Sequence, residues 1–162
     1  MITMEGRRVD VLYLISGGAR QQPRPEPAAE LYDGLWFRSA RGRAERDGDA
    51  WFILSARHGL LHPETRVQPY ADRLEGCSAV ARRAWIALAT ERMERMLPEA
   101  GRVVALCDRG PPPELLRWLR VRYPEVETPL AGLNIAAQVL HMARDADRFA
   151  RVAPRRRFAG LA

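Results

Sequence analysis

Three short apolar runs constrain the fold of this chain more than any other feature. They are Val9–Ser16, Trp51–Ser55 and Arg102–Cys107. Each is mainly apolar and is followed closely by glycine, histidine or charged residues, which is typical of a buried strand that ends in a loop. A shorter run at residues 126–128 is a further candidate strand.

Helical patterns separate these runs. The sequence predicts helices over about residues 28–46, 79–97 and 133–146, and one that begins near residue 113. Ser78 is a candidate N-cap for the second helix. We expect an inward stripe on the last helix, formed by Ala136, Val139, Leu140 and Ala143. Residues 56–77 show no regular pattern, and a segment of that length in a compact domain usually has a function.

Strands that alternate with helices favour a mostly parallel sheet that is covered on both faces. We therefore predict an α/β fold, a single three-layer domain with a mostly parallel sheet of about four strands flanked by helices. The chain has 162 residues, which is the length of one domain. We expect that domain over residues 1–150 and a basic, flexible tail over residues 151–162.

The composition points to an anionic partner. All 26 basic residues are arginine, and the formal net charge is +6. A GC-rich genome would explain the absence of lysine, whereas guanidinium groups also hold phosphate oxygens in pairs. Whatever caused the arginine bias, the positive charge favours nucleotide or nucleic-acid partners modestly.

Several classes of protein are not expected. Two cysteines and three histidines stand in no metal-binding spacing, so we predict neither a metal nor a cofactor. No apolar run reaches the roughly 20 residues that span a membrane, and the N-terminus lacks a signal-peptide core. We expect a cytoplasmic protein without a membrane partner, and the sequence leaves its oligomeric state open.

Polar segments follow three of the predicted strands. They are Ser16-Gly17-Gly18-Ala19-Arg20, Ser55-Ala56-Arg57-His58-Gly59 and Asp108-Arg109-Gly110. Ligands of open α/β sheets bind beyond the carboxyl ends of the strands, so we expect these segments to meet at one edge. The first segment suits an anion, because glycines let backbone N–H groups approach closely, or it is only a tight turn.

The second segment offers candidate catalytic groups. A neutral His58 imidazole in a loop is able to act as acid, base or donor, or it caps a turn. A Ser55–His58 nucleophile pair is conceivable, although no hydrolase oxyanion elements are visible. Beyond it, Tyr70 either stacks on a base or plugs the edge of the core. Asp72 and Asp108 are candidate carboxylates, and Asp108 is also a candidate helix N-cap.

A wider motif resembles a known family. The run from Ile53 to Pro63, ILSARHGLLHP, is followed by Gln68-Pro69-Tyr70 and resembles the YaaA family. It is still more similar to short bacterial domains that share this core. Their preceding helix and C-terminal region match here at Ala28, Leu31, Tyr32, Phe37, Arg38, Pro129–Leu133 and Gln138.

The chain departs from that group at two places. The group usually has a cysteine and a basic residue after its first strand, where this chain has Ser16–Arg20. It also usually has an aspartate directly after the motif tyrosine. Here that position is Ala71, and the acid comes one residue later at Asp72.

The resemblance spans about residues 9–145 and implies nucleotides or nucleic acid as partners. YaaA-like proteins are linked to DNA binding and oxidative-stress protection. Related domains accompany base-modifying and base-excising enzymes. Together with the strand ends, the resemblance gives the following candidate site. The predicted catalytic residues are His58, Asp72 and Ser55, and the predicted substrate-binding residues are Ser16, Gly17, Gly18, Arg20, Tyr32, Arg38, Gly59, Tyr70 and Asp108.

Three functions follow as hypotheses. The first is an enzyme that hydrolyses the N-glycosidic bond of a nucleotide or of modified nucleic acid, which needs an anion site, an aromatic side chain and a carboxylate or imidazole. The second is a non-catalytic DNA- or RNA-binding protein linked to stress protection, with steeply salt-dependent binding. The third is a partner-binding domain whose polar loops only cap the sheet.

Overall fold

A five-stranded, mostly parallel sheet forms the centre of the computed structural model, which describes residues 6–149 and the side chains of residues 6–143. The strand order is β4-β3-β1-β6-β7. The strands are β1 (Arg8–Ser16), β3 (Ala50–Ser55), β4 (Gly59–Leu61), β6 (Glu99–Leu106) and β7 (Glu125–Glu127). Only β4 runs antiparallel to its neighbour, β3. The α/β prediction is confirmed, with five strands in place of about four.

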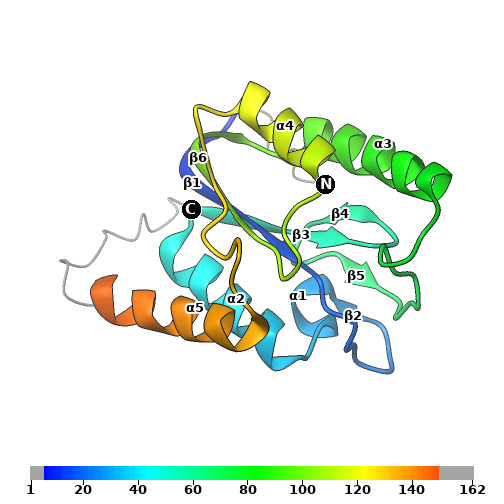
Figure 1. Cartoon of the computed structure of the whole chain (residues 1–162), viewed down its shortest axis with the longest axis horizontal. Coiled ribbons are helices and arrows are strands. Elements are labelled where there is room, and N and C mark those ends of the chain that lie inside the picture. The colour runs from blue at the N-terminus through cyan, green and yellow to red at the C-terminus, as the bar shows by residue number, and fades with distance from the viewer. Residues whose placement is uncertain (1–5, 150–162) are drawn as a thin grey trace, which may run out of the picture.

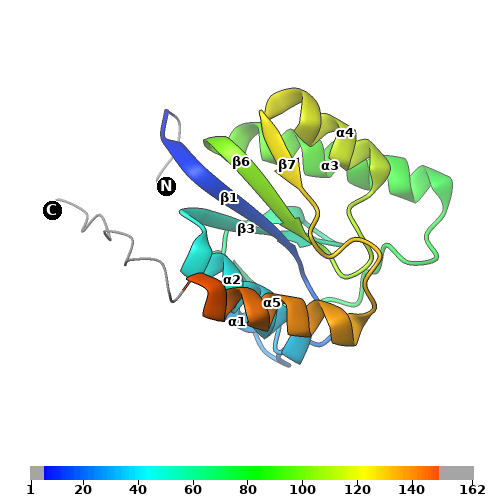
Figure 2. The same cartoon turned by 60° about the vertical axis from the view of Figure 1, so that its left-hand side comes forward.

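Helices cover both faces of the sheet, which makes three layers (Figures 1 and 2). The helices α3 (Ala79–Met96) and α4 (Pro113–Arg122) lie on one face. The opposite face carries α1 (Ala28–Leu31), α2 (Leu35–Asp47) and α5 (Ile135–Phe149). The predicted N-cap is present, since the Ser78 side chain accepts a hydrogen bond from the backbone N–H of Ala81.

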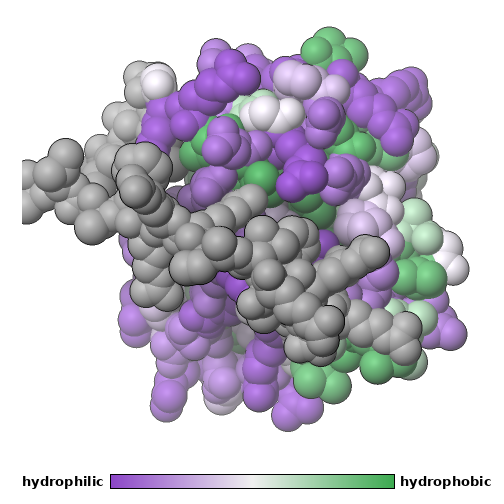
Figure 3. All heavy atoms as spheres, turned by 90° about the vertical axis from the view of Figure 1, so that its left-hand side faces the viewer, coloured by the Kyte–Doolittle hydropathy of each residue, from purple (hydrophilic) through white to green (hydrophobic). Residues whose placement is uncertain are grey.

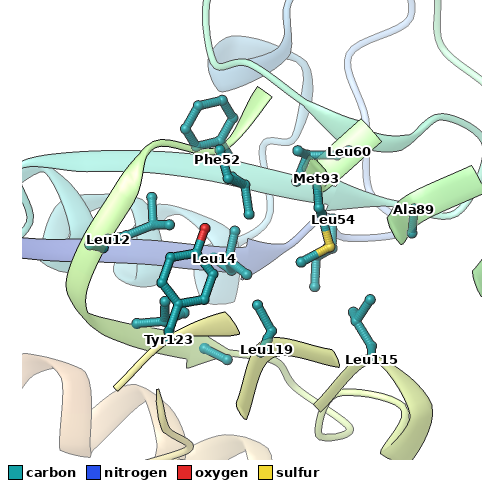
Figure 4. Packing of buried hydrophobic residues seen from close by; sticks show 14 of the residues in the cluster. Leu12, Leu14, Phe52, Leu54, Leu60, Ala89, Met93, Leu115, Leu119 and Tyr123 are labelled. Atoms are coloured by element: carbon teal, nitrogen blue, oxygen red, sulfur yellow. The ribbon is translucent and has the colours of Figure 1, made fainter. Parts of the chain in front are cut away.

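The central position of β1 in the sheet explains why its sequence is continuously apolar. Leu12 and Leu14 face α3 and α4, whereas Tyr13 and Ile15 face α2 and α5. Successive side chains of a strand point to opposite faces, so a strand between two helical layers needs apolar residues at every position. The side chains between the sheet and the α3–α4 layer form one hydrophobic cluster, which Figure 4 shows. In it, strand and hairpin residues pack against residues of and next to the two helices: Leu12, Leu14, Phe52, Leu54 and Leu60 with Ala89, Met93, Leu115, Leu119 and Tyr123.

The helix predicted over residues 28–46 is two helices. Tyr32 is extended and forms an isolated β-bridge with Gln21, and Gly34 at the start of α2 is also extended. The chain leaves the helical path here because the Tyr32 side chain turns into the core, where its exposure is 2%. This break places Tyr32 behind the turn that follows β1.

Residues 56–77 are more regular than expected. A short turn after Ser55 brings Gly59 opposite Ser55 and forms β4 as a hairpin with β3. Further along, β5 (Arg66–Val67) pairs with β2 (Glu26–Pro27) in a separate two-stranded sheet. β2 and β5 have two residues each and β4 has three, and strands this short give no periodic pattern.

The predicted inward stripe of the last helix is wrong. Ala136 and Ala143 are exposed and Leu140 is 56% exposed, whereas Gln138 and Met142 are buried. The reason is a buried hydrogen bond, in which Trp36 Nε1 of α2 donates to Gln138 Oε1 at 2.7 Å. This bond turns the Gln138 side of α5 toward the protein, in place of the side with the most apolar residues.

Figure 3 shows the side that carries the amino ends of the parallel strands, where most of the coloured residues are hydrophilic. No described helix has the length and apolarity that a membrane crossing requires. The tail predicted over residues 151–162 lies outside the described residues.

The strand order places a topological switch point between β1 and β6. The chain passes from β1 to β3 through α1 and α2 on one face, and from β6 to β7 through α4 on the other. The two connections therefore lead in opposite directions from the middle of the sheet. In open α/β sheets, the crevice at the carboxyl ends beside such a point is where ligands bind.

Candidate functional site

A cleft of about 650 Å³ lies at the carboxyl ends of β1, β3 and β6. Its walls come from the turn after β1, the loop over residues 70–77 and the loop between β6 and α4. The register of the sheet brings these segments together, because Ser16 pairs with Leu54 and Ile15 pairs with Leu106. The three polar strand ends singled out in the sequence thus converge, although the third wall is formed by residues 70–77 and not by His58.

Ser16 and Asp108 bridge the switch point. Ser16 Oγ donates to Asp108 Oδ1 at 3.2 Å and accepts the backbone N–H of Asp108 at 3.3 Å. Asp108 Oδ1 also accepts the N–H of Arg109 at 3.0 Å. Asp108 does not cap α4, whose N-cap residue is Pro112. The carboxylate is instead held in the cleft by the serine that was predicted to bind phosphate.

The turn after β1 presents backbone to the cleft. The Gly17 N–H donates to the Leu54 carbonyl at 2.9 Å, whereas the N–H groups of Gly18 and Ala19 donate to no residue of the described chain. A Cβ on Gly17 would lie 2.7 Å from the Tyr32 ring. Gly17 is therefore required for close packing, and Gly18 and Ala19 leave two donors for a ligand.

Tyr70 lines the cleft and is half-buried, and its hydroxyl is held in the protein. That hydroxyl shares hydrogen bonds with the Tyr32 hydroxyl at 2.6 Å and with Ser55 Oγ at 2.9 Å. The backbone N–H of Tyr70 donates to Gln21 Oε1 at 2.9 Å. Burial, and then the neighbouring Tyr70, raise the pKa of Tyr32 above its usual value. The cluster keeps Tyr32 protonated and fixes the Tyr70 ring.

Ser55 and His58 lie behind this tyrosine. Ser55 is fully buried, and its Oγ accepts the backbone N–H of His58 at 3.1 Å. The His58 ring meets the Tyr70 ring edge-on, with centroids 5.7 Å apart. Burial, followed by the nearby Arg92 and Arg57, lowers the pKa of His58, so its imidazole is neutral at pH 7. Neither residue is among those that line the cleft.

Asp72 does line the cleft and is paired. Arg57 Nη1 lies 3.2 Å from Asp72 Oδ1, and the two side chains are 57% and 49% exposed. Asp72, the acid two residues after Tyr70, is thus at the site, and Ala71 beside it lines the wall as well.

Besides the buried Tyr32, three further predicted binding residues lie outside the cleft. Arg20 pairs with Asp33 at 3.4 Å, and Arg38 donates to the Asp33 carbonyl. Gly59 has φ of +72°, and its added Cβ would lie 3.0 Å from the Cα of Ala89 in α3. None of the three lines the cleft, and each has a structural contact of its own.

The loop over residues 70–77 supplies groups that the sequence reasoning missed. Arg73 and Glu75 line the cleft, and Glu75 pairs with Arg109 at 2.7 Å. The only signal for them was that they belong to the long segment without periodicity, which favours function but names no residue. Cys77 and Cys107 also line the cleft, and burial raises the pKa of Cys107 to about 12, so its thiol is unreactive.

The charges of the cleft balance. Its charged lining consists of the carboxylates Asp72, Glu75 and Asp108 and the arginines Arg73, Arg82 and Arg109. Among the described residues, no group of three or more histidine, cysteine or acidic side chains is arranged to hold a metal ion. The site therefore combines carboxylates, guanidinium groups, the aromatic residues Tyr70 and Trp85, and free backbone donors.

Comparison with known proteins returns one family. A model described as "Family of unknown function (DUF6884)" matches residues 12–144, which include every element from the middle of β1 into α5. No curated protein and no solved structure matches the chain.

Proposed function

The chain belongs to the DUF6884 family of unknown function, and we propose that it binds a nucleotide in the cleft at the switch point and hydrolyses its N-glycosidic bond. The observation that carries this proposal is one shared cleft. Asp72, Asp108, Tyr70, Gly18 and Ala19 all line it. These are the groups that such a reaction needs: carboxylates for the sugar, an aromatic face for the base and donors for phosphate.

Each part of the ligand has a proposed partner. The base lies against the Tyr70 ring, whose position is fixed by two hydroxyl hydrogen bonds and by the neutral His58. The phosphate accepts hydrogen bonds from Gly18 and Ala19. His58, predicted as a catalytic residue, takes the role of a positioning residue here, because it contacts Tyr70 and does not line the cleft.

The two carboxylates divide the chemistry. As the bond between the anomeric carbon and the base nitrogen breaks, the base leaves with the electron pair and the sugar gains oxocarbenium character. Asp108 stabilises that positive charge. Asp72 takes a proton from water, the hydroxide adds to the anomeric carbon, and the proton passes to the departing base. The products are a free base and a sugar phosphate.

The resemblance of residues 53–70 to YaaA-like domains supports the same class of partner. We propose kinship with that family on this motif. The spacing from Ser55 to Tyr70 has a physical meaning in this chain, because the two hydroxyls are hydrogen-bonded and Tyr70 reaches the cleft.

Base release tests the proposal. We expect Asp72→Asn and Asp108→Asn each to lower the rate of base release from nucleotides by more than about 100-fold, the usual scale of an acid–base group. Chromatography of reaction mixtures measures the free base. Asp10→Asn is the matched control, since Asp10 is an exposed residue of β1 that does not line the cleft.

Thermal unfolding of both variants separates lost chemistry from lost structure, since Asp108 also bonds Ser16. Full activity in both folded variants would overturn the assignment. If only one of the two folded variants kept full activity, both chemical roles would be assigned to the carboxylate whose replacement lowered the rate.

A further inference from the structure

We propose that the cleft selects a free nucleoside 5′-monophosphate over the uncharged nucleoside, over di- and triphosphates and over a nucleic-acid strand. This inference rests on the proposed function and narrows its substrate class. Its basis is the charge of the cleft, which differs from the charge of the molecule. The chain carries +6 in total, whereas the cleft-lining side chains comprise three carboxylates and three arginines.

Most of these charges are already paired. Asp72 lies against Arg57 at 3.2 Å, Glu75 against Arg109 at 2.7 Å and Arg82 against Glu114 at 3.2 Å. Of the charged lining, this leaves Arg73 and Asp108, which form no ion pair with a described residue. One free cation and one free anion remain to meet the ligand.

The free cation suits a single phosphate group. Arg73 is exposed and lines the same cleft as the Gly18 and Ala19 backbone donors. A guanidinium fork and two N–H groups are enough to hold the oxygens of one phosphate. A nucleoside leaves these donors unused, so it binds without their charge-assisted hydrogen bonds.

The free anion disfavours further phosphates. Asp108 uses Oδ1 for Ser16 and Arg109, and its other oxygen accepts no hydrogen bond from the described residues. That oxygen is able to accept a sugar hydroxyl. The same negative charge repels the added charge of a di- or triphosphate. Among the described residues, no unpaired arginine other than Arg73 lines the cleft to compensate.

A nucleic-acid strand needs a basic track, which the cleft lacks. Proteins that bind single strands combine aromatic rings with a positively charged groove along the backbone. Here exposed arginines such as Arg83, Arg95 and Arg120 lie on α3 and α4, outside the cleft lining. The excess positive charge is therefore not concentrated where the proposed base site is.

Calorimetry on the full chain tests the inference by measuring the binding affinity of a series of probes. The probes are nucleosides, their 5′-mono-, di- and triphosphates, and a short single-stranded oligonucleotide. We expect the monophosphate to bind at least about fivefold more tightly than the triphosphate. Arg73→Gln is expected to weaken monophosphate binding about 10-fold and to leave nucleoside binding unchanged. The control is Arg120→Gln, an exposed arginine of α4 outside the cleft.

The outcomes separate two failures. Tighter binding of the triphosphate or of the oligonucleotide, or equal binding of nucleoside and monophosphate, would overturn the monophosphate preference while nucleotide binding stands. Absence of binding by every probe would overturn the proposed function and this inference together. Equal losses in Arg73→Gln and Arg120→Gln would show a general charge effect and would also contradict the inference.

Discussion

Tyr70 joins the core to the cleft through its two ends. Its hydroxyl is hydrogen-bonded to Tyr32 and Ser55 inside the protein, and Tyr70 is also a lining residue of the cleft. The sequence left open whether this side chain stacks on a ligand or plugs the edge of the core. The geometry allows both, because the polar end satisfies the buried hydroxyls while the ring stays accessible. Ser55, a predicted nucleophile, is fully buried and serves as a partner in this cluster.

Gly59 gives a sharp test of the turn that orients His58. Its φ is +72° and its Cβ would meet the backbone of Ala89 at 3.0 Å. We expect Gly59→Ala to lower the free energy of unfolding by about 2 kcal/mol, from left-handed strain plus steric overlap. Urea unfolding measures this change.

The matched control for Gly59 is Gly42→Ala. Gly42 lies within α2, and a Cβ there would meet nothing within 4 Å. Alanine is the better helix former, so this variant is expected to gain about 0.5–1 kcal/mol. If Gly59→Ala unfolded at the same urea concentration as the unmodified chain, the packing of β4 against α3 would have to be revised.

At the scale of elements, continuous apolar runs were predictable from the sequence and short strand pairings were not. The runs that became β1, β3 and β6 are long and apolar, so burial alone specifies them. The hairpin of β4 and the break at Tyr32 depend on contacts between residues distant in sequence, which local patterns do not contain. The convergence of the strand ends was predictable, because it follows from the parallel strands alone. The presence of Arg73 and Glu75 in the cleft was not, because it depends on contacts between distant residues.

Gln138 connects α5 by a hydrogen bond to the loop that contains Asp108. Its Nε2 donates to the Asp108 and Leu133 carbonyls at 2.9 and 2.8 Å, and its Oε1 accepts from Trp36. We expect Gln138→Leu to lower the free energy of unfolding by at least about 2 kcal/mol, because buried polar groups lose their partner. Thermal unfolding measures the loss.

Leu140→Gln on the same helix is the control for that prediction. Leu140 is 56% exposed, so its replacement is expected to change stability by no more than about 0.5 kcal/mol. Equal effects of the two substitutions would mean that Gln138 contributes no more than an ordinary surface residue of α5.

At the scale of the whole molecule, topology sets the place of the candidate site, and we propose that charge sets its selectivity. The switch point between β1 and β6 opens the crevice, and the ends of both strands are joined there by Ser16 and Asp108. The net charge of +6 draws anions to the molecule in general, whereas the balanced cleft admits few negative charges.

The most direct test of a nucleotide site at the switch point is a crystal structure of the chain with a nucleoside 5′-monophosphate. The account predicts phosphate density at the N–H groups of Gly18 and Ala19 and beside Arg73, the base against the Tyr70 ring, and the sugar next to Asp108. A nucleotide bound at another surface, or an empty cleft at a concentration that saturates binding in solution, would contradict it.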